Sequence, residues 1–150
     1  MSGRFEGRVA LATGSTQGVG EALLSRMADE GLAGAVVTGR DAQRGEGVRA
    51  ALVAKGCDAI FVPADLGNAA EVASLIERAD ERFGRIDHLA NCGALTSRGT
   101  IWDTDVELFD HMMAVNARAP FQLFQGVARL ARRNQAPASI VNVGSTSGHG

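Results

Sequence analysis

The sequence predicts a doubly wound α/β fold, in which helices cover both faces of a parallel sheet. Five short apolar segments alternate with helical segments along the 150 residues, and this order is typical of βαβ units. The apolar segments are hydrophobic throughout, as expected for strands that are buried on both faces. A glycine-rich turn joins the first strand to the first helix, and no linker or low-complexity segment divides the chain, so one domain is expected.

Each of the five expected strands is a short apolar run bounded by turn residues or polar residues. In chain order they are residues 9–12, 35–38, 59–62, 86–90 and 139–143. The first run ends in Thr13 and Gly14, Pro63 closes the third, and Gly144 begins a loop after the fifth. None of the runs alternates between apolar and polar residues, which favours strands buried in the middle of a layered fold.

The expected helices lie between the strands, where apolar residues recur at intervals of three and four. They cover residues 19–27, 42–55, 72–83 and about 104–133. Glycine stops follow the first three, at Gly31, Gly56 and Gly84. Capping-box patterns that begin at Asn68 and Thr104 open the third and fourth helices. The fourth is expected to be interrupted near residues 116–120, because Pro120 has no backbone N–H.

Composition and charge limit the function classes. Lys plus Arg number 15 and Asp plus Glu 17, for a net charge of −2, so no general electrostatic attraction to nucleic acid or anionic membrane is expected. No signal-peptide core or membrane span is present. Cys57 and Cys92 form no Cys-x-x-Cys pair, which favours free thiols in the cytoplasm. His88 and His111 lack partners at metal-ligand spacing, so structural roles and no metal site are expected.

The glycine-rich turn is the first candidate ligand site. It reads Thr13, Gly14, Ser15, Thr16, Gln17, Gly18, Val19, Gly20. Glycines permit a sharp turn and let backbone N–H groups approach an anion, and the N-terminus of the following helix favours a pyrophosphate. A tight turn that only packs the helix on the sheet is the alternative, and the turn alone does not separate the two interpretations.

Together with four later segments, this turn resembles the short-chain dehydrogenase/reductase (SDR) family. Its spacing, Gly-x-x-x-Gly-x-Gly, is the family's, and the later segments follow in the family's order. They are Asp65-Leu66, Asn91-Cys92-Gly93-Ala94, Met113-Ala114-Val115-Asn116 and Ile140 to Ser145. The resemblance spans essentially the whole chain. It implies a Rossmann-type sheet with strand order 3-2-1-4-5, and a dinucleotide-binding domain over residues 1–150 that lacks the family's later strands and helices.

The resemblance also implies which residues contact the cofactor. These are Gly14, Ser15, Thr16, Gln17, Gly18, Val19, Gly20, Arg40, Asp65, Leu66, Asn91, Cys92 and Gly93. Asp65 would bind the adenine amino group, although it could instead be a favourable charge at the next helix N-terminus. Thr13 would tie the turn to the segment at Asn91. Cys92 and Gly93-Ala94 depart from the family's usual Asn and Ala-Gly, but the turn there is expected to persist.

Two residues match the family's catalytic positions. Ser145 would hold the substrate oxygen, and Asn116 would hold a water in a proton relay. The alternatives are a turn hydrogen bond for Ser145 and a helix break for Asn116. The family's catalytic Tyr-x-x-x-Lys pair should follow Ser145, yet the chain has no Tyr and its single Lys is Lys55. We therefore expect these residues to be the N-terminal part of a longer enzyme, and to be inactive or nearly so alone.

The choice of cofactor depends on the end of the second strand. A carboxylate there would bind the adenosine ribose diol and select NAD, but the position is Gly39, followed by Arg40. A guanidinium pairs well with a phosphate, which favours NADP over NAD. Asp41 is adjacent, and Gln17 stands where a second basic residue would help, so NAD remains the alternative.

The expected function is an NAD(P)-dependent oxidoreductase that interconverts an alcohol and a ketone. A non-catalytic dinucleotide-binding or interaction module is the alternative, and a methyltransferase of similar fold is disfavoured by the series Asp65, Asn91, Asn116 and Ser145. The resemblance implies a small-molecule substrate and a homodimer or homotetramer. The family's substrate-selecting residues lie mostly after the catalytic Tyr, so neither the substrate nor the reaction direction is predicted.

Overall fold

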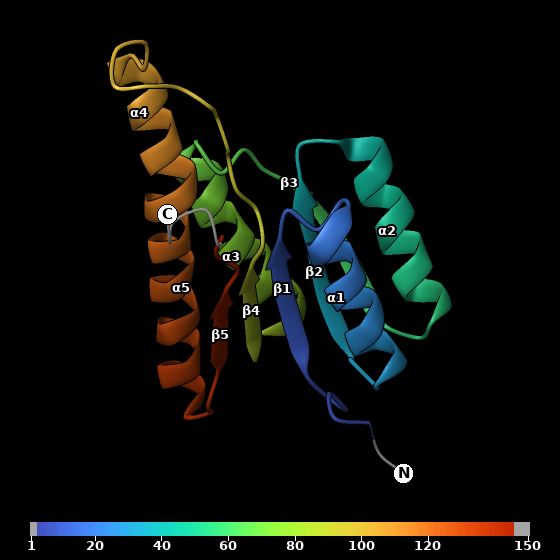
Figure 1. The fold of residues 1–150 in the computed structure, drawn as a ribbon. Coiled ribbons are helices and arrows are strands. Elements are labelled where there is room, and N and C mark those ends of the chain that lie inside the picture. Colours follow the sequence, from blue (N-terminus) through green and yellow to red (C-terminus); the bar gives the residue numbers. More distant parts are fainter. Residues whose placement is uncertain (1–2, 146–150) are drawn as a thin grey trace.

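Five strands form one parallel sheet in a computed structural model that describes residues 3–145 (Figure 1). In chain order they are β1 (Val9–Thr13), β2 (Gly34–Gly39), β3 (Asp58–Pro63), β4 (His88–Asn91) and β5 (Ser139–Asn142). Their order across the sheet is β3-β2-β1-β4-β5, and each neighbouring pair is parallel. The predicted fold class and strand order are confirmed.

Helices cover both faces of the sheet, as the apolar strands predict. On one face lie α1 (Gly18–Asp29) and α2 (Ala42–Ala54), and on the other α3 (Ala69–Phe83) and α5 (Ala119–Asn134) (Figure 1). A short helix, α4 (Val106–Met113), and a π-helical segment, η1 (Ala114–Arg118), lead into α5. None of the helices within residues 3–145 has the length and apolar character needed to cross a membrane.

The core consists of two apolar layers, one on each face, because successive strand residues point to opposite faces. Ala10 and Ala12 of β1 pack in the layer under α1 and α2, whereas Leu11 belongs to the layer under α3 and α5. β5 lies at the edge of the sheet, as the predicted strand order implies. Val141 is exposed there, whereas the apolar run alone favours a buried strand.

The long helical region differs from the prediction at its start. Asp105, rather than Thr104, caps α4, because the Asp105 carboxylate accepts a hydrogen bond from the Leu108 N–H at 2.7 Å. The Thr104 hydroxyl instead donates to the Thr100 carbonyl at 2.8 Å. The predicted interruption is present, but the helix widens into η1 there and does not break. Pro120 lies in the first turn of α5, where a missing N–H is tolerated.

The fourth strand begins two residues later than predicted, at His88. Asp87, which directly precedes it, has a buried carboxylate that bonds to the start of β1 and to two arginines. The carboxylate of Asp87 is 5% exposed. It accepts hydrogen bonds from the Val9 N–H at 2.8 Å, from Arg8 at 3.3 Å and from Arg85. Burial opposes ionisation of Asp87 and is the largest single influence, but these hydrogen bonds together outweigh it and lower its pKa.

Replacing Asp87 with asparagine should destabilise the protein by about 2–3 kcal/mol at neutral pH, because two guanidinium groups then lose their ionic partner. Thermal denaturation should show a melting temperature lower by about 4–12 °C. Since the folded pKa is lowered, the stabilisation is present above the ordinary carboxyl pKa and is lost as pH falls through the folded value. The difference between the two proteins should therefore shrink in acid, and an equal difference at every pH would contradict this account.

Candidate functional site

In the glycine-rich turn, the backbone of Gly14 packs directly against the backbone of Gly93, in the loop that follows β4. Gly14 has a φ of +61°, and a Cβ there would lie 2.7 Å from the Gly93 Cα, so only glycine fits. The side chain of Gln17, the N-cap of α1, makes no capping hydrogen bond. The N–H groups in the first turn of α1 are thus left for an anion at the helix N-terminus.

Two hydroxyl groups fix this turn in place. The Thr13 Oγ1 accepts hydrogen bonds from the backbone N–H groups of Cys92 at 3.1 Å and Gly93 at 3.0 Å. The predicted tie between the turn and the Asn91 segment is therefore confirmed, and the altered turn after β4 persists. The buried Ser15 hydroxyl donates to the Ala12 carbonyl at 2.6 Å and accepts from the Thr38 N–H at 3.0 Å. Ser15 thus anchors the turn to β2.

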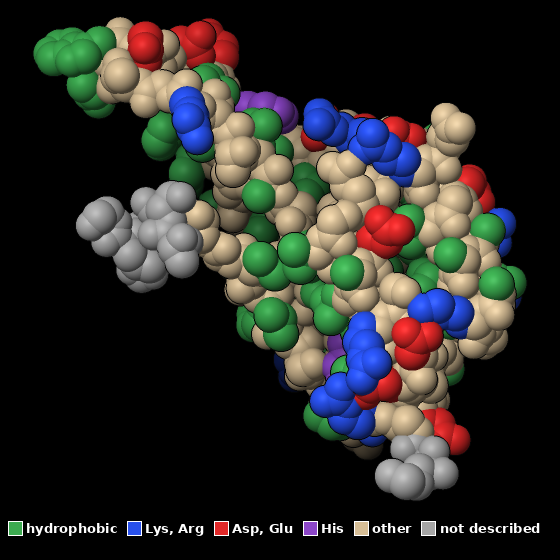
Figure 2. All heavy atoms as spheres, turned by 45° about the vertical axis from the view of Figure 1, so that its right-hand side comes forward, with side chains coloured by type: hydrophobic (Ala, Val, Ile, Leu, Met, Phe, Trp, Pro, Cys, Tyr) green, Lys and Arg blue, Asp and Glu red, His purple; other side chains and the backbone are tan. Residues whose placement is uncertain are grey.

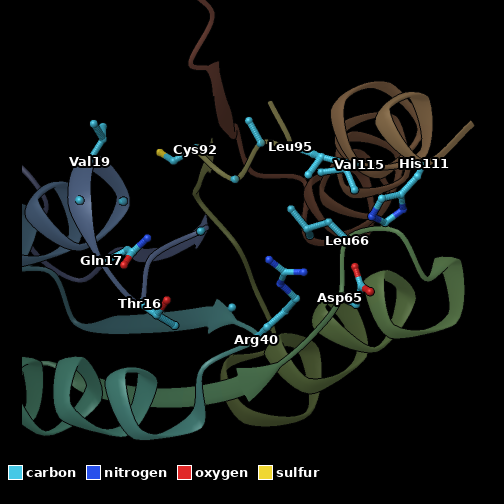
Figure 3. Close-up of a pocket in the computed structure, with 16 residues that line it drawn as sticks. Thr16, Gln17, Val19, Arg40, Asp65, Leu66, Cys92, Leu95, His111 and Val115 are labelled. Atoms are coloured by element: carbon cyan, nitrogen blue, oxygen red, sulfur yellow. The ribbon is translucent and has the colours of Figure 1, made fainter. Parts of the chain in front are cut away.

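A cleft of about 360 Å³ opens at the carboxyl ends of the strands, above this turn (Figure 3). It is lined by Gly14, Thr16, Gln17, Gly18, Val19, Gly20, Gly39, Arg40, Asp65, Leu66, Cys92, Gly93, Ala94, Leu95, His111 and Val115. We call it the cofactor cleft, after the cofactor-contacting role that the family resemblance implies for most of these residues. Of the predicted cofactor-binding residues, Ser15 and Asn91 lie outside its wall. Both are buried, and Asn91 lines the neighbouring cleft described below.

The end of β2 offers positive charge to the cofactor cleft. A Cβ on Gly39 would lie 2.6 Å from the Thr16 Cγ2, so the turn leaves no space for a carboxylate side chain at this position. Arg40 follows and is exposed in the cleft wall. Among residues 3–145, no hydrogen bond or ion pair engages its guanidinium.

Asp41 and Arg44 form an ion pair at this end of the cleft that the sequence did not predict. The Asp41 carboxylate caps α2 through the Arg44 N–H at 3.0 Å and pairs with the Arg44 side chain at 3.3 Å. The Arg44 guanidinium also donates to the Gln17 side chain. Arg44 therefore lies beside Gln17, a contact that sequence spacing did not reveal, and its charge is balanced by that of Asp41.

A second cleft, of about 630 Å³, adjoins the first and contains both predicted catalytic residues. Asn116 and Ser145 line it, together with Asn91, Asn142, Val143 and Gly144. It shares its wall with the cofactor cleft along residues 92–95. We call it the substrate cleft, after the substrate-holding role that the family resemblance implies for Ser145.

Comparison with known proteins places this arrangement in a family. The model of the short chain dehydrogenase family matches residues 8–150. The chain belongs to the short-chain dehydrogenase family. Among curated relatives, the 2,5-dichloro-2,5-cyclohexadiene-1,4-diol dehydrogenase LinX of Sphingobium indicum is 33% identical over 149 residues, which are 99% of this chain and 58% of that protein.

Solved structures of SDR proteins share the fold. A metagenomic short-chain oxidoreductase in complex with NADP matches with a TM-score of 0.89 and 26% identity, covering 97% of this chain and 66% of that one. A short chain dehydrogenase from Burkholderia cenocepacia in complex with NADP has a TM-score of 0.86 and 31% identity over 95% of this chain and 57% of its own. The chain spans about half the length of the curated relatives it matches.

Asn116 of this SDR chain lies in η1, and both polar atoms of its side chain bond to the backbone of Leu95. The Nδ2 donates to the Leu95 carbonyl at 2.8 Å, and the Oδ1 accepts from the Leu95 N–H at 2.9 Å. The amide thereby fixes the loop shared by the two clefts. The Asn116 carbonyl lacks its usual helical donor four residues on, because Pro120 has no N–H.

The cysteines and histidines of the SDR chain lie in different environments. Burial raises the pKa of the Cys57 thiol to about 11, and burial also raises the pKa of Cys92. Both thiols are free. His88 has the predicted structural role, since its ring packs edge-on against Phe5 and its Nδ1 lies 2.7 Å from the Ser139 Oγ. His111, for which a structural role is predicted as well, lies in the wall of the cofactor cleft.

Proposed function

We propose that the protein is an NADP-dependent oxidoreductase that interconverts an alcohol and a ketone. The observation that carries the proposal is the shared wall at residues 92–95, which joins a cleft built for a dinucleotide to one lined by Ser145 and Asn116. A substrate carbon beside Ser145 can lie against a nicotinamide that enters from the cofactor cleft. Proximity and orientation of two reacting groups account for a large part of the rate of such a transfer.

The residues present fit NADP. The close approach of Gly14 and Gly93 leaves room for backbone to contact a pyrophosphate. Arg40 stands where a 2′-phosphate of the adenosine ribose would lie, and Thr16 excludes a carboxylate at Gly39. Arg44 lies next to this end, but its guanidinium is paired with Asp41 and Gln17, so Arg40 is the main cation offered to the phosphate. The two solved SDR neighbours that are described with NADP agree with this choice.

The residues of this chain would orient the substrate and support proton transfer. Bound NADPH supplies a hydride to the carbonyl carbon. The Ser145 hydroxyl donates a hydrogen bond to the carbonyl oxygen and stabilises the negative charge that develops on it during hydride transfer. The Asn116 carbonyl holds a water through which the proton donor is protonated again. In the reverse direction, the alcohol carbon would give its hydride to NADP⁺, and the alcohol oxygen would give its proton to the same acid–base group.

The proton donor in this proposal is the family's Tyr, with its pKa lowered by a neighbouring Lys. The chain contains no Tyr. Its only Lys, Lys55, pairs with Asp29 at 2.8 Å and donates to the Ser25 hydroxyl at 2.7 Å, away from both clefts. We therefore assign Tyr and Lys to the part of the relatives' length that this chain does not cover, and expect residues 1–150 alone to bind NADPH with little or no turnover.

A steady-state assay tests the proposed activity. A protein that carries residues 1–150 together with the Tyr and Lys assigned above should oxidise NADPH in the presence of one or more members of a panel of ketones, with one alcohol formed per NADPH consumed. NADH should support slower turnover at equal concentration. NADPH binding without hydride transfer to any ketone or from any alcohol would favour a non-catalytic binding module instead.

We further propose that the protein forms a homodimer or homotetramer through α4 and α5. Large apolar side chains on these helices are exposed, namely Val106, Phe109, Met113, Phe121 and Phe124. An apolar surface of this kind is typical of an interface between subunits. Replacing Phe121 with aspartate should shift sedimentation toward the monomer and leave the helical circular dichroism unchanged. A wild-type monomer at every concentration would contradict this proposal.

A cytoplasmic location is also proposed, since both thiols are free in the structure and such thiols persist in reducing compartments. Cell fractionation tests it, and recovery with secreted or membrane material would contradict it.

A further inference from the structure

His111 is the polar residue of the cofactor cleft that the proposed mechanism leaves without a role. It lies on α4 and lines the same end of the cleft as Asp65, Leu66 and Val115. In Figure 3 its imidazole extends from the helix toward the end of the cleft where the Asp65 carboxylate lies. Two side chains from distant parts of the sequence therefore meet at one place in the cleft.

The loop at Gly67 shows how close the two groups are. A Cβ on Gly67 would lie 2.9 Å from the His111 Nδ1 and 3.2 Å from the Asp65 Oδ1. The absence of a side chain at this residue is what lets the imidazole and the carboxylate approach the same point. The Asp65 Oδ1 is fixed there, because it accepts a hydrogen bond from the Gly67 N–H at 2.8 Å.

Both groups retain hydrogen-bonding capacity for a ligand. Within residues 3–145, no hydrogen bond or ion pair joins His111 to Asp65, and none engages the His111 ring or the second carboxylate oxygen of Asp65. The site thus offers one acceptor, the carboxylate, beside one donor, an imidazole N–H. Leu66 and Val115 supply an apolar wall next to them.

This donor and acceptor pair matches one edge of an adenine ring. The 6-amino group donates hydrogen bonds, and the neighbouring ring nitrogen accepts one. We propose that His111 is an adenine-recognition residue of this chain, donating to that ring nitrogen while Asp65 accepts from the amino group. The inference rests on the proposed function, since the adenine belongs to NADP, and it assigns specificity to a residue outside the glycine-rich turn.

Binding of NADP and of 1,N6-etheno-NADP tests the inference, because the etheno bridge blocks this edge of the adenine and leaves the phosphates unchanged. Both affinities are measured by calorimetry on the intact protein, for the wild type and for His111→Ala, His111→Phe and His111→Gln. His88→Gln is the matched control, since His88 lies outside the cofactor cleft.

The wild type should prefer NADP to the etheno analogue. His111→Ala and His111→Phe should each weaken NADP binding by about five- to tenfold, as expected for one lost hydrogen bond, and leave binding of the analogue unchanged. His111→Gln, which keeps an N–H donor, should restore most of the NADP affinity.

Equal losses for both nucleotides, or no loss for NADP, would overturn the role of His111 and leave the proposed function intact. Failure of the wild type to bind either nucleotide would instead overturn the proposed function, and this inference with it.

Discussion

Ser145→Ala, made in a protein that carries residues 1–150 together with the assigned Tyr and Lys, is expected to lower the turnover number by about 10²–10³-fold, the usual cost of removing one donor to a developing oxyanion. Ser145 lines the substrate cleft beside Asn116, outside the cofactor cleft. NADPH affinity should therefore be unchanged while hydride transfer slows. The measurement pairs steady-state kinetics with direct titration of NADPH.

Ser145→Thr is the matched variant, because it keeps a hydroxyl at the same carbon. It should retain more activity than the alanine variant if the hydroxyl is the group that acts. Full turnover by Ser145→Ala would show that Ser145 only forms the turn after β5, which is its alternative role.

Arg40→Ala should weaken NADPH binding by about 10–100-fold, because hydrogen bonds to a charged partner contribute roughly 1.5–3 kcal/mol. NADH lacks the 2′-phosphate, so its affinity should be unchanged. Arg44→Ala should have a smaller effect of the same sign, since its guanidinium is already shared with Asp41 and Gln17. Fluorescence titration of each nucleotide gives both values.

Arg129→Ala serves as the control for a general loss of positive charge, because Arg129 lies on α5 and outside the cofactor cleft. It should leave both affinities unchanged. Equal binding of NADH and NADPH by the wild type, or unchanged NADPH affinity in Arg40→Ala, would contradict the assignment of Arg40.

Much of the fold could be predicted because its signals are local. Each strand is a short apolar run next to a turn residue, and parallel strands buried on both faces need no long-range information to be recognised. The tie from Thr13 to the loop after β4 was available only through the family resemblance. It is confirmed by two hydrogen bonds to backbone N–H groups.

The parts of the site that sequence did not predict come from contacts between distant segments. His111 and Val115 reach the cofactor cleft because α4 and η1 lead the chain back over the ends of the strands. Arg44 reaches Gln17 from the first turn of α2. No spacing rule links these pairs. Ser15 is predicted to contact the cofactor because of its place in the motif. Its hydroxyl instead accepts a hydrogen bond from the Thr38 N–H of β2, which the motif does not indicate.

Titration of the purified protein with NADPH and with NADH, followed by nicotinamide fluorescence, tests the central claim most directly. The account predicts saturable binding of NADPH, at least about tenfold tighter than binding of NADH, and competition by 2′,5′-ADP, which carries the adenosine and the 2′-phosphate. No saturable binding of either nucleotide would contradict the assignment of the cofactor cleft and the proposed oxidoreductase function with it.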